Sequence, residues 1–280
     1  MPSTFFNTGL KFPMKLTINN ISLNYDVIGQ GDPLILIGGL TANCREWQRV
    51  VPYLQNHFTI YIPENRGAGL TTGWMPKFTI EHMADDIATL IDSLKLDKAY
   101  VVGHSMGGAI LQRLCMKYPH QVQAAVIASS FAHFPKAAQL YIEHTSELFA
   151  AGLNIELVLR IIYTRLYGSA FLNDASRVAD EMQRMLTDQV PQTPEGYQAQ
   201  VQAIAAFDAR EDLNQIQCPT LILNGLEDIL TPPYLSEDLH RNIKNSKLTI
   251  MPQCGHMLPQ ENPKEFAESV LNFYTAIRQR

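Results

Sequence analysis

Ala99-Tyr100-Val101-Val102-Gly103-His104-Ser105-Met106-Gly107-Gly108 is the most informative stretch of the sequence. Its first four residues favour a buried strand, and a helix is predicted from Met106 to Tyr118. The G-x-S-x-G pattern between them predicts a sharp turn, in which glycines flank Ser105 because a Cβ would collide in so tight a bend. The turn presents the serine hydroxyl at the edge of a sheet, so Ser105 is a candidate nucleophile. The alternative is a glycine-rich turn with an incidental serine.

Strands and helices alternate on both sides of this stretch. Further strands are predicted at 15–18, 21–27, 34–37, 58–62, 124–128, 220–223 and 247–251. A helix is predicted from Thr79 to Leu94, because apolar residues recur there at spacings of three and four. This alternation predicts an α/β fold with a doubly wound, mostly parallel sheet.

The strand signals stop between Phe131 and Phe207, where helical spacing of apolar residues takes over. One helix in this region is predicted to begin with Thr193 as its N-cap and Pro194 as its first residue. We therefore expect residues 131–207 to be a helical insertion. Residues 1–130 and 208–280 are expected to form the core that it interrupts.

Composition limits the class of protein. The chain has 280 residues, 46% of them hydrophobic and 18% charged, which is enough for one main domain with a large core. The net charge of −5 and the lack of a basic run argue against nucleic acid as a partner. The N-terminal stretch contains Phe5, Phe6 and Phe12 but no continuous apolar segment, so neither secretion nor membrane insertion is expected. No oligomeric state is assigned.

The cysteines indicate neither a metal site nor a disulfide framework. They are widely spaced, without a C-x-x-C pair or a histidine cluster at metal-ligand spacing, and stand at Cys44, Cys115, Cys218 and Cys254. We expect reduced thiols, a cytoplasmic protein and no cofactor.

Two residues downstream of Ser105 are candidates for its base and its acid. A serine hydroxyl needs a histidine to remove its proton and an acid to orient that histidine. His256 follows the predicted strand at 247–251, and Asp228 follows the predicted strand at 220–223. Because parallel strands end at the same edge of a sheet, we expect all three side chains there.

Other acids and histidines fit this pattern less well. Glu227 is adjacent to Asp228, but the glycine turn before the pair favours Asp228. Asp85 and Asp86 are expected on the solvated face of their predicted helix. His104 belongs to the turn but is expected to face away from the hydroxyl. The remaining histidines are expected at solvated or packed positions.

Gly38-Gly39-Leu40 follows a predicted buried strand, where acyl-transfer chemistry needs donors for a developing oxyanion. The candidate donors are the backbone N–H groups of Leu40 and Met106, the second of them helped by the helix dipole. An ordinary strand-to-loop turn is the alternative for the Leu40 segment. No substrate-binding residue is assigned.

Five motifs, in this order, resemble the α/β-hydrolase superfamily, specifically its cap-bearing serine esterases and enol-lactonases. They lie at 38–47, 64–69, 103–108, 224–228 and 255–256, and the resemblance extends from about Leu16 to Tyr274. It implies Ser105 as nucleophile, Asp228 as triad acid, His256 as base, Leu40 and Met106 as oxyanion amides, and 131–207 as the cap.

The sequence departs from the family pattern at two places. Gly38 stands where a histidine is common, and Glu64 stands where an aspartate is usual before the Asn-Arg-Gly turn. Dehalogenases and epoxide hydrolases of this fold carry aspartate at the nucleophile position, so Ser105 disfavours those chemistries.

The function expected from these features is hydrolysis of a small or medium carboxylic ester, lactone or thioester through an acyl-enzyme on Ser105. The partner is then a small ester-like molecule. One alternative is a carbon–carbon bond hydrolase or lyase of the same fold, which needs the same base. Another is a signalling protein that keeps the hydrolase pocket as a ligand sensor.

Overall fold

A computed structural model describes residues 14–279 except 189 and 191; the predicted N-terminal tail, with Phe5, Phe6 and Phe12, lies outside this part. The described residues form an eight-stranded sheet in the order β1-β2-β4-β3-β5-β6-β7-β8. The strands are β1 Met14–Ile18, β2 Ile21–Gly29, β3 Asp32–Ile37, β4 Phe58–Pro63, β5 Ala99–His104, β6 Val122–Ala128, β7 Thr220–Gly225 and β8 Ser246–Met251. β2 pairs antiparallel with β1 and β4, and the other pairings are parallel. The predicted α/β class and mostly parallel sheet are confirmed.

The sheet begins with a hairpin whose turn is made by Asn19 and Asn20. Both have positive φ, at 44° and 63°, which is the backbone conformation that a two-residue hairpin turn requires. The turn joins β1 and β2 in the register that pairs Ile18 with Ile21.

Side chains of the central strands alternate between two apolar layers. Ile35 and Ile37 of β3 pack into one layer, whereas Leu34 and Leu36 pack into the other. Because both faces of β3 are covered, all four residues are fully buried, as is typical of a parallel strand.

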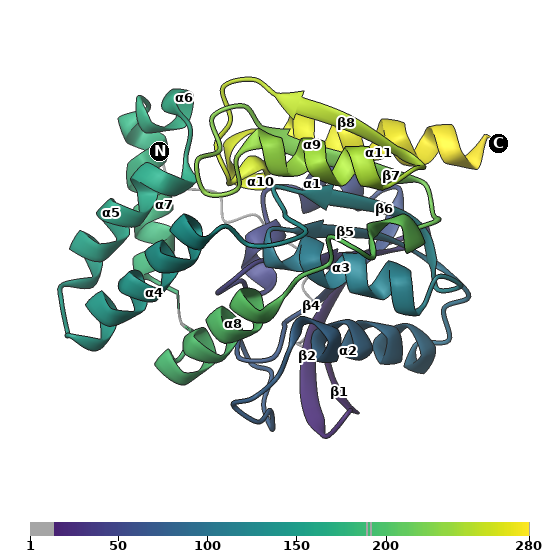
Figure 1. The fold of residues 1–280 in the computed structure, drawn as a ribbon, viewed down its shortest axis with the longest axis horizontal. Coiled ribbons are helices and arrows are strands. Elements are labelled where there is room, and N and C mark those ends of the chain that lie inside the picture. The colour runs from purple at the N-terminus through teal and green to yellow at the C-terminus, as the bar shows by residue number, and fades with distance from the viewer. Residues whose placement is uncertain (1–13, 189, 191, 280) are drawn as a thin grey trace.

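Helices cover both faces of the sheet (Figure 1). The first layer contains side chains from α2 Ile80–Ser93, α3 Met106–Lys117 and α9 Pro233–Asn242, together with the short helix η2 Leu213–Gln215. The second contains side chains from η1 Cys44–Trp47, α1 Val51–Leu54, α10 Leu258–Glu261 and α11 Pro263–Arg278.

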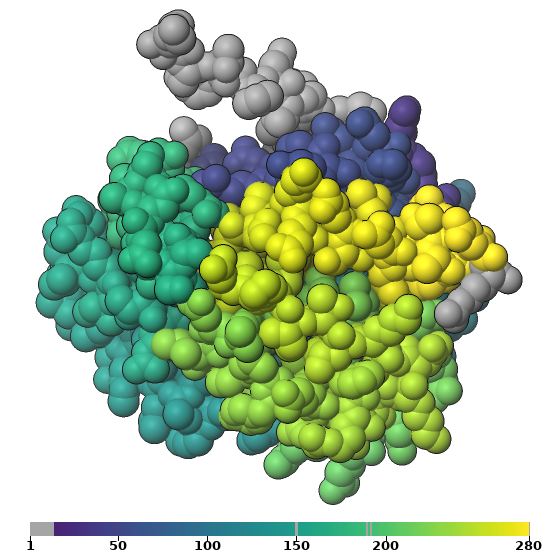
Figure 2. Space-filling model, turned by 90° about the horizontal axis from the view of Figure 1, so that it is seen from above, coloured from purple at the N-terminus to yellow at the C-terminus, as the bar shows by residue number. Residues whose placement is uncertain are grey.

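Five α-helices precede η2 between β6 and β7 in the described part of the chain: α4 Lys136–Ala150, α5 Ile155–Leu166, α6 Ser169–Leu172, α7 Ala175–Leu186 and α8 Pro194–Ala206. Figure 1 shows them gathered beside the sheet, on the left. Figure 2 shows the teal part of this group, which precedes the green α8 in the chain, against the yellow C-terminal segments. The N–H of Gly168 donates to Glu261 at 2.8 Å across this seam. α8 begins at Pro194 with Thr193 as its N-cap, as predicted.

The five helices divide their apolar packing between the sheet layer and a small cluster of their own. Ile142 of α4 and Ile204 of α8 belong to the same cluster as α2 and α3. Tyr163, Tyr167 and Phe171 form a separate cluster, in which the rings of Tyr167 and Phe171 stack with centroids 4.2 Å apart. The helices nearest the sheet are therefore part of its core.

The structure contradicts the prediction that Asp86 lies on a solvated helix face. Asp86 is buried, and both of its carboxylate oxygens accept hydrogen bonds from Arg66, at 2.6 and 2.8 Å. Asn19, at the hairpin turn, also donates to Asp86 at 3.0 Å. The hairpin packs over α2 and buries the carboxylate, which the helical periodicity of α2 alone does not reveal.

The structure bears on the expected state of the cysteines and on membrane-spanning helices. All four cysteines are free thiols. Within residues 14–279, apart from the two gaps, no helix combines the length and the apolar character needed to span a bilayer.

Candidate active site

Ser105 occupies a strained turn between β5 and α3. Its φ is 53° and its ψ is −118°, a conformation that residues with a Cβ rarely adopt. A Cβ at Gly103 would collide with the backbone of Gly107, and a Cβ at Gly107 would collide with the carbonyl of Ile37. The Ser130 hydroxyl donates to the Ser105 carbonyl at 2.8 Å. Close backbone packing and this hydrogen bond therefore hold the turn in place.

The structure brings Ser105, His256 and Asp228 together. His256 Nε2 lies 3.0 Å from Ser105 Oγ, and His256 Nδ1 lies 2.9 Å from Asp228 Oδ2. When Nδ1–H donates to Asp228, Nε2 is left to accept the serine proton. His256 and Asp228 are both almost completely buried and follow the ends of β8 and β7. This geometry allows proton transfer from the serine hydroxyl to the imidazole.

Asp228 sits in a donor-rich turn. Its Oδ1 accepts the N–H groups of Leu230 at 2.9 Å and Thr231 at 2.8 Å, and its Oδ2 accepts the Thr231 hydroxyl at 2.7 Å. Burial opposes ionisation of this carboxyl, but the charge of His256 and hydrogen bonds from His256 and Thr231 outweigh burial and lower its pKa. Asp228 is therefore ionised at neutral pH.

Thr231, which was not predicted from the sequence, also belongs to this arrangement. Its hydroxyl oxygen lies 3.0 Å from His256 Nδ1 and 3.0 Å from the carbonyl oxygen of Ser129. An aspartate side chain often closes a turn with residues that follow it closely, such as a threonine three residues later. This spacing between Asp228 and Thr231 is the sequence signal from which the contact could have been predicted.

The rival acid Glu227 points elsewhere. Its carboxylate accepts the N–H and the hydroxyl of Ser169, at the start of α6, at 2.5 and 2.9 Å. His104 faces away from the serine hydroxyl, as predicted: its Nδ1 lies 2.5 Å from Glu46 Oε1 and its Nε2 lies 2.9 Å from the His256 carbonyl oxygen. Glu46 was not expected near the site from the sequence.

The loop after β3 leaves the Leu40 amide without a partner. The N–H of Gly39 donates to Glu46 Oε2 at 3.1 Å, and the N–H of Thr41 donates to the side-chain oxygen of Gln200 at 3.2 Å. Between these two occupied amides, the Leu40 N–H has no hydrogen-bond acceptor within the described residues. It is therefore available to a ligand.

Met106 presents a second free amide beside Ser105. It is the first residue of α3, where backbone N–H groups lack a partner within the helix. No acceptor for its N–H lies in the part of the chain that the structure describes. An ideal Cβ at Gly39 would stand 3.2 Å from the Ser105 Cβ, so the loop after β3 comes very close to the turn that carries Ser105.

Metal chemistry has no evident support in the described residues. Within residues 14–279, leaving aside the two gaps, no group of three or more histidine, cysteine or acidic side chains is placed to hold a metal ion. Burial raises the pKa of the Cys254 thiol to about 12, so that this thiol is not a nucleophile at neutral pH.

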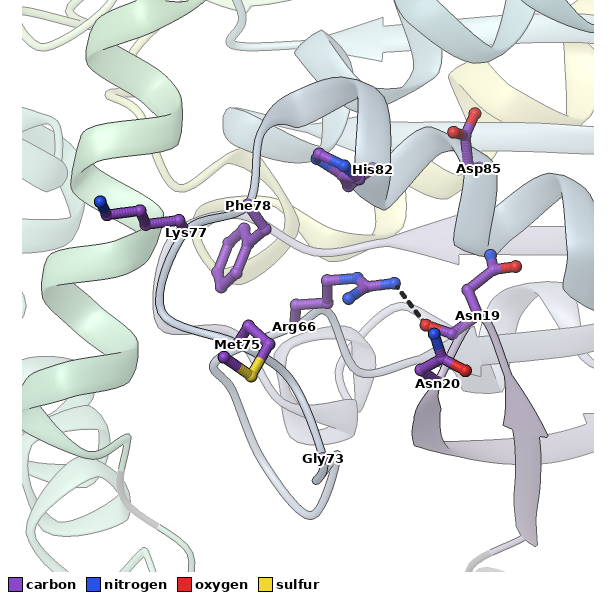
Figure 3. Close-up of a pocket in the computed structure, with 9 residues that line it drawn as sticks. All are labelled: Asn19, Asn20, Arg66, Gly73, Met75, Lys77, Phe78, His82 and Asp85. Carbon is purple, nitrogen blue, oxygen red and sulfur yellow. Dashed lines mark hydrogen bonds between the residues drawn. The ribbon is translucent and has the colours of Figure 1, made fainter.

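A surface cavity of about 420 Å³ lies apart from this constellation. Figure 3 shows Arg66 within it, donating to the Asn19 carbonyl oxygen at 3.2 Å, with Phe78 and His82 above. Because none of Ser105, Asp228 and His256 lines this cavity, we do not assign it to the candidate active site.

Residues 32–263 match a protein family described as the alpha/beta hydrolase fold. The chain belongs to this family. It is 28% identical to a Mycobacterium tuberculosis protein named "Putative non-heme bromoperoxidase BpoC" over 262 residues, which cover 92% of this chain and 99% of that protein. It is 26% identical to 3-oxoadipate enol-lactonase 2 of Acinetobacter baylyi, over 92% of this chain and 95% of the relative.

Solved structures agree with this assignment. The crystal structure of BpoC superposes with a TM-score of 0.84 at 28% identity and covers 94% of this chain and 97% of that chain. A thermophilic esterase from Thermogutta terrifontis superposes with a TM-score of 0.83 at 25% identity, covering 95% of this chain and 99% of that chain. The protein is thus an α/β-hydrolase enzyme with a small-molecule substrate. The relatives' names differ in reaction, so the fold does not fix the substrate.

Proposed function

We propose that the protein is a serine hydrolase that cleaves a small or medium carboxylic ester, lactone or thioester through an acyl-enzyme on Ser105. The observation that carries the proposal is the hydrogen-bonded series from Ser105 through His256 to Asp228, at 3.0 and 2.9 Å. The unpartnered amides of Leu40 and Met106 support it, because acyl transfer needs donors for an oxyanion.

In the proposed reaction, His256 Nε2 takes the proton of Ser105 as Oγ bonds to the acyl carbon. The carbonyl oxygen becomes an oxyanion and accepts the N–H groups of Leu40 and Met106. His256 then gives its proton to the leaving alkoxide or thiolate, and the bond from the acyl carbon to that group breaks. Water, deprotonated by His256, attacks the acyl-enzyme, and the carboxylic acid and free Ser105 result.

The five helices between β6 and β7 support the assignment of residues 131–207 as a cap. Leu40 packs against the large apolar cluster that includes Phe131 and Phe134, at the start of the insertion, and Tyr141 of α4 packs against the same cluster. An acyl group bound beside Leu40 would meet hydrocarbon and aromatic surface rather than charge. We therefore propose that the acyl part of the substrate is uncharged and apolar.

Labelling with a fluorophosphonate tests the proposed nucleophile, because such reagents form a stable adduct with an activated serine. We expect one adduct per chain in the wild-type protein and none in Ser105→Ala. Ser269→Ala, which removes a hydroxyl on α11 away from the site, serves as the matched control and is expected to label normally. An adduct that persists in Ser105→Ala would exclude the assignment.

A panel of p-nitrophenyl esters of increasing acyl length and of enol-lactones tests the reaction class. We expect rapid multiple turnovers on at least one member and loss of turnover in Ser105→Ala. Labelling without turnover on any ester or lactone would favour the carbon–carbon bond hydrolase. A single slow turnover, with a ligand-dependent change in partner binding, would instead favour a sensor.

A further inference from the structure

Glu46 and His104 form a buried ion pair next to the proposed active site. Glu46 Oε1 lies 2.5 Å from His104 Nδ1, and the two side chains are 6% and 2% exposed. Glu46 belongs to η1, whereas His104 is the last residue of β5 and immediately precedes Ser105. Neither side chain touches the serine hydroxyl, so the proposed reaction leaves the pair without a role.

The hydrogen bonds of the pair fix how many protons it holds. His104 Nε2 lies 2.9 Å from the carbonyl oxygen of His256, which can only accept, so Nε2 carries a hydrogen. His104 Nδ1 faces the Glu46 carboxylate, and one proton must lie between these two groups for them to bond. The count is the same whether the proton resides on nitrogen or on oxygen. The pair is thus neutral overall while it keeps this proton.

The pair joins the two loops on which the proposed chemistry depends. Glu46 Oε2 accepts the N–H of Gly39, next to the Leu40 amide, at 3.1 Å. At the other end, His104 donates to the backbone of His256 itself. A continuous series of hydrogen bonds therefore runs from the oxyanion loop, through Glu46 and His104, to the residue that carries the base.

Gly38, where the sequence departs from the family pattern, makes room for this arrangement. A Cβ at position 38 would collide with Glu46 Oε2 and with the Cβ of Ala42. Any side chain at this position would have to displace the Glu46 carboxylate from the Gly39 amide. The position of the Glu46 carboxylate therefore requires glycine at 38.

We propose that Glu46 and His104 are positioning residues that act as one unit, and that the proton held between them keeps the oxyanion loop and the His256 backbone in register with Ser105. This inference rests on the proposed function of the site. It predicts that loss of the shared proton at alkaline pH places a net negative charge in a buried position, loosens both loops and lowers kcat.

The electrostatic surroundings set the direction of this pH dependence. Within the described residues, the titratable groups that face His104 are Glu46 on η1, Asp228 after β7 and His256 after β8. Burial lowers the pKa of His104, but the Glu46 charge, the hydrogen bonds to Glu46 and to the His256 carbonyl, and the Asp228 charge raise it above 6.5 overall. A raised pKa means that the proton is kept at and below pH 6.5 and is lost as pH rises through the raised value.

The pH profile of Glu46→Gln tests the proposal. Glutamine can accept the Gly39 N–H through its oxygen and donate to His104 Nδ1 through its nitrogen, so the contacts stay and the titratable proton is removed. We expect the wild-type kcat to decline at alkaline pH with the loss of one proton, and the Glu46→Gln profile to lack this decline. In Glu46→Ala, which leaves both contacts empty, kcat should fall about a hundredfold with little change in KM.

Asp86→Asn is the matched control, since it removes another buried, ion-paired carboxylate that lies outside the site. It should keep the alkaline decline of the wild-type protein. If Glu46→Gln also keeps that decline, the pair does not act through its proton and the proposal is wrong.

Nitrogen NMR of histidine-labelled protein gives a second readout that does not depend on activity. We expect both ring nitrogens of His104 to be bonded to hydrogen, or to share the proton with Glu46, well above pH 6.5; His104→Gln assigns the signals. A His104 ring that loses a proton near pH 6.5 would overturn the proposal. Wild-type protein that fails to label with a fluorophosphonate would contradict the proposed function. Normal labelling, together with a retained alkaline decline in Glu46→Gln or proton loss from His104 near pH 6.5, would contradict only the proposed role of the Glu46–His104 pair.

Discussion

The sheet core and the helices inserted between β6 and β7 are held in place in different ways. In β3 and β5, residues such as Ile35 and Val101 have no exposed surface. In the insertion, Leu153, Leu157 and Ile161 are each about half exposed, at 45%, 52% and 47%. Burial of hydrocarbon fixes the strands that carry the proposed reactive groups, whereas the outer helices of the insertion depend less on it.

Polar contacts join the insertion to the core in addition to the apolar packing of α4 and α8. Gln200 of α8 is fully buried, accepts from Thr41 N–H at 3.2 Å and donates to the Arg66 carbonyl at 2.7 Å. Farther out, the carboxylate of Glu181 on α7 pairs with Arg49 of the core at 3.2 Å. We therefore expect substitutions in the core to lower kcat directly. Substitutions in the insertion should change the position of the loop after β3 or the free energy of unfolding, according to their distance from Ser105.

Asp228→Asn should give the largest effect, because it acts on the core side. Asparagine keeps the shape but favours the wrong tautomer of His256, so kcat should fall by about ten-thousandfold. The lowered pKa of Asp228 means that its contribution to folding stability is present above the ordinary value of 3.8 and is lost as pH falls through the lowered value. Urea unfolding at several pH values should therefore show a stability gap between wild type and variant that closes in acid. If the variant keeps the wild-type kcat, Asp228 does not take part in the proposed reaction.

Gln200→Ala should give an intermediate effect, because it breaks the contact between the insertion and the proposed oxyanion loop. Without its acceptor, Thr41 N–H no longer fixes the segment beside Leu40, and kcat should fall by about tenfold to a hundredfold. Steady-state kinetics on the best ester measures this. Gln198→Ala, at an exposed position on the same helix, is the matched control and should leave kcat unchanged. Equal kinetics for the two variants would mean that the insertion does not position this loop.

Glu181→Gln should give the smallest effect on chemistry but a clear effect on stability. The Glu181 side chain is fully buried and contacts Arg49, Arg184 and Tyr167. Because both arginines are partly exposed, loss of the charge should cost about 2 kcal/mol, less than for a fully buried pair.

The pH dependence of this stability difference has a definite sign. Burial raises the pKa of Glu181, but hydrogen bonds and charges from Arg184 and Arg49 lower it overall. The stabilisation is therefore present above the ordinary value of 4.5 and fades as pH falls through the lowered value. Urea denaturation near pH 7 and pH 3 measures the difference, while kcat/KM on a short ester should stay within about twofold. A large loss of kcat with unchanged stability would show that Glu181 acts on catalysis rather than on stability, contrary to this prediction.

Local patterns were sufficient to predict most of the sheet and the pairing of the reactive groups. The apolar run before Ser105 and the strands that precede Asp228 and His256 each carry a periodicity or a turn signal within a few residues. Thr193 and Pro194 likewise mark a helix start by their local chemistry, and the structure confirms it.

Contacts between distant parts of the chain could not be predicted in this way. Asp86 is buried because a hairpin 67 residues earlier in the chain folds over its helix, and that contact leaves no trace in the periodicity of the helix. Glu46 meets His104 across 58 residues, and η1 is too short to show a pattern. Such pairings depend on how elements pack, which a single sequence does not encode locally.

The collision at Gly38 has a consequence for how this site can change over evolutionary time. Glu46 can be replaced while position 38 remains glycine, but a side chain cannot enter at 38 while Glu46 stays where it is. Substitutions at the two positions are therefore order-dependent: the carboxylate has to leave, and the Ala42 Cβ has to shift, before a side chain is acquired at 38. Any route between the two arrangements of this loop, in either direction, therefore passes through a form that has glycine at 38 and no carboxylate at 46.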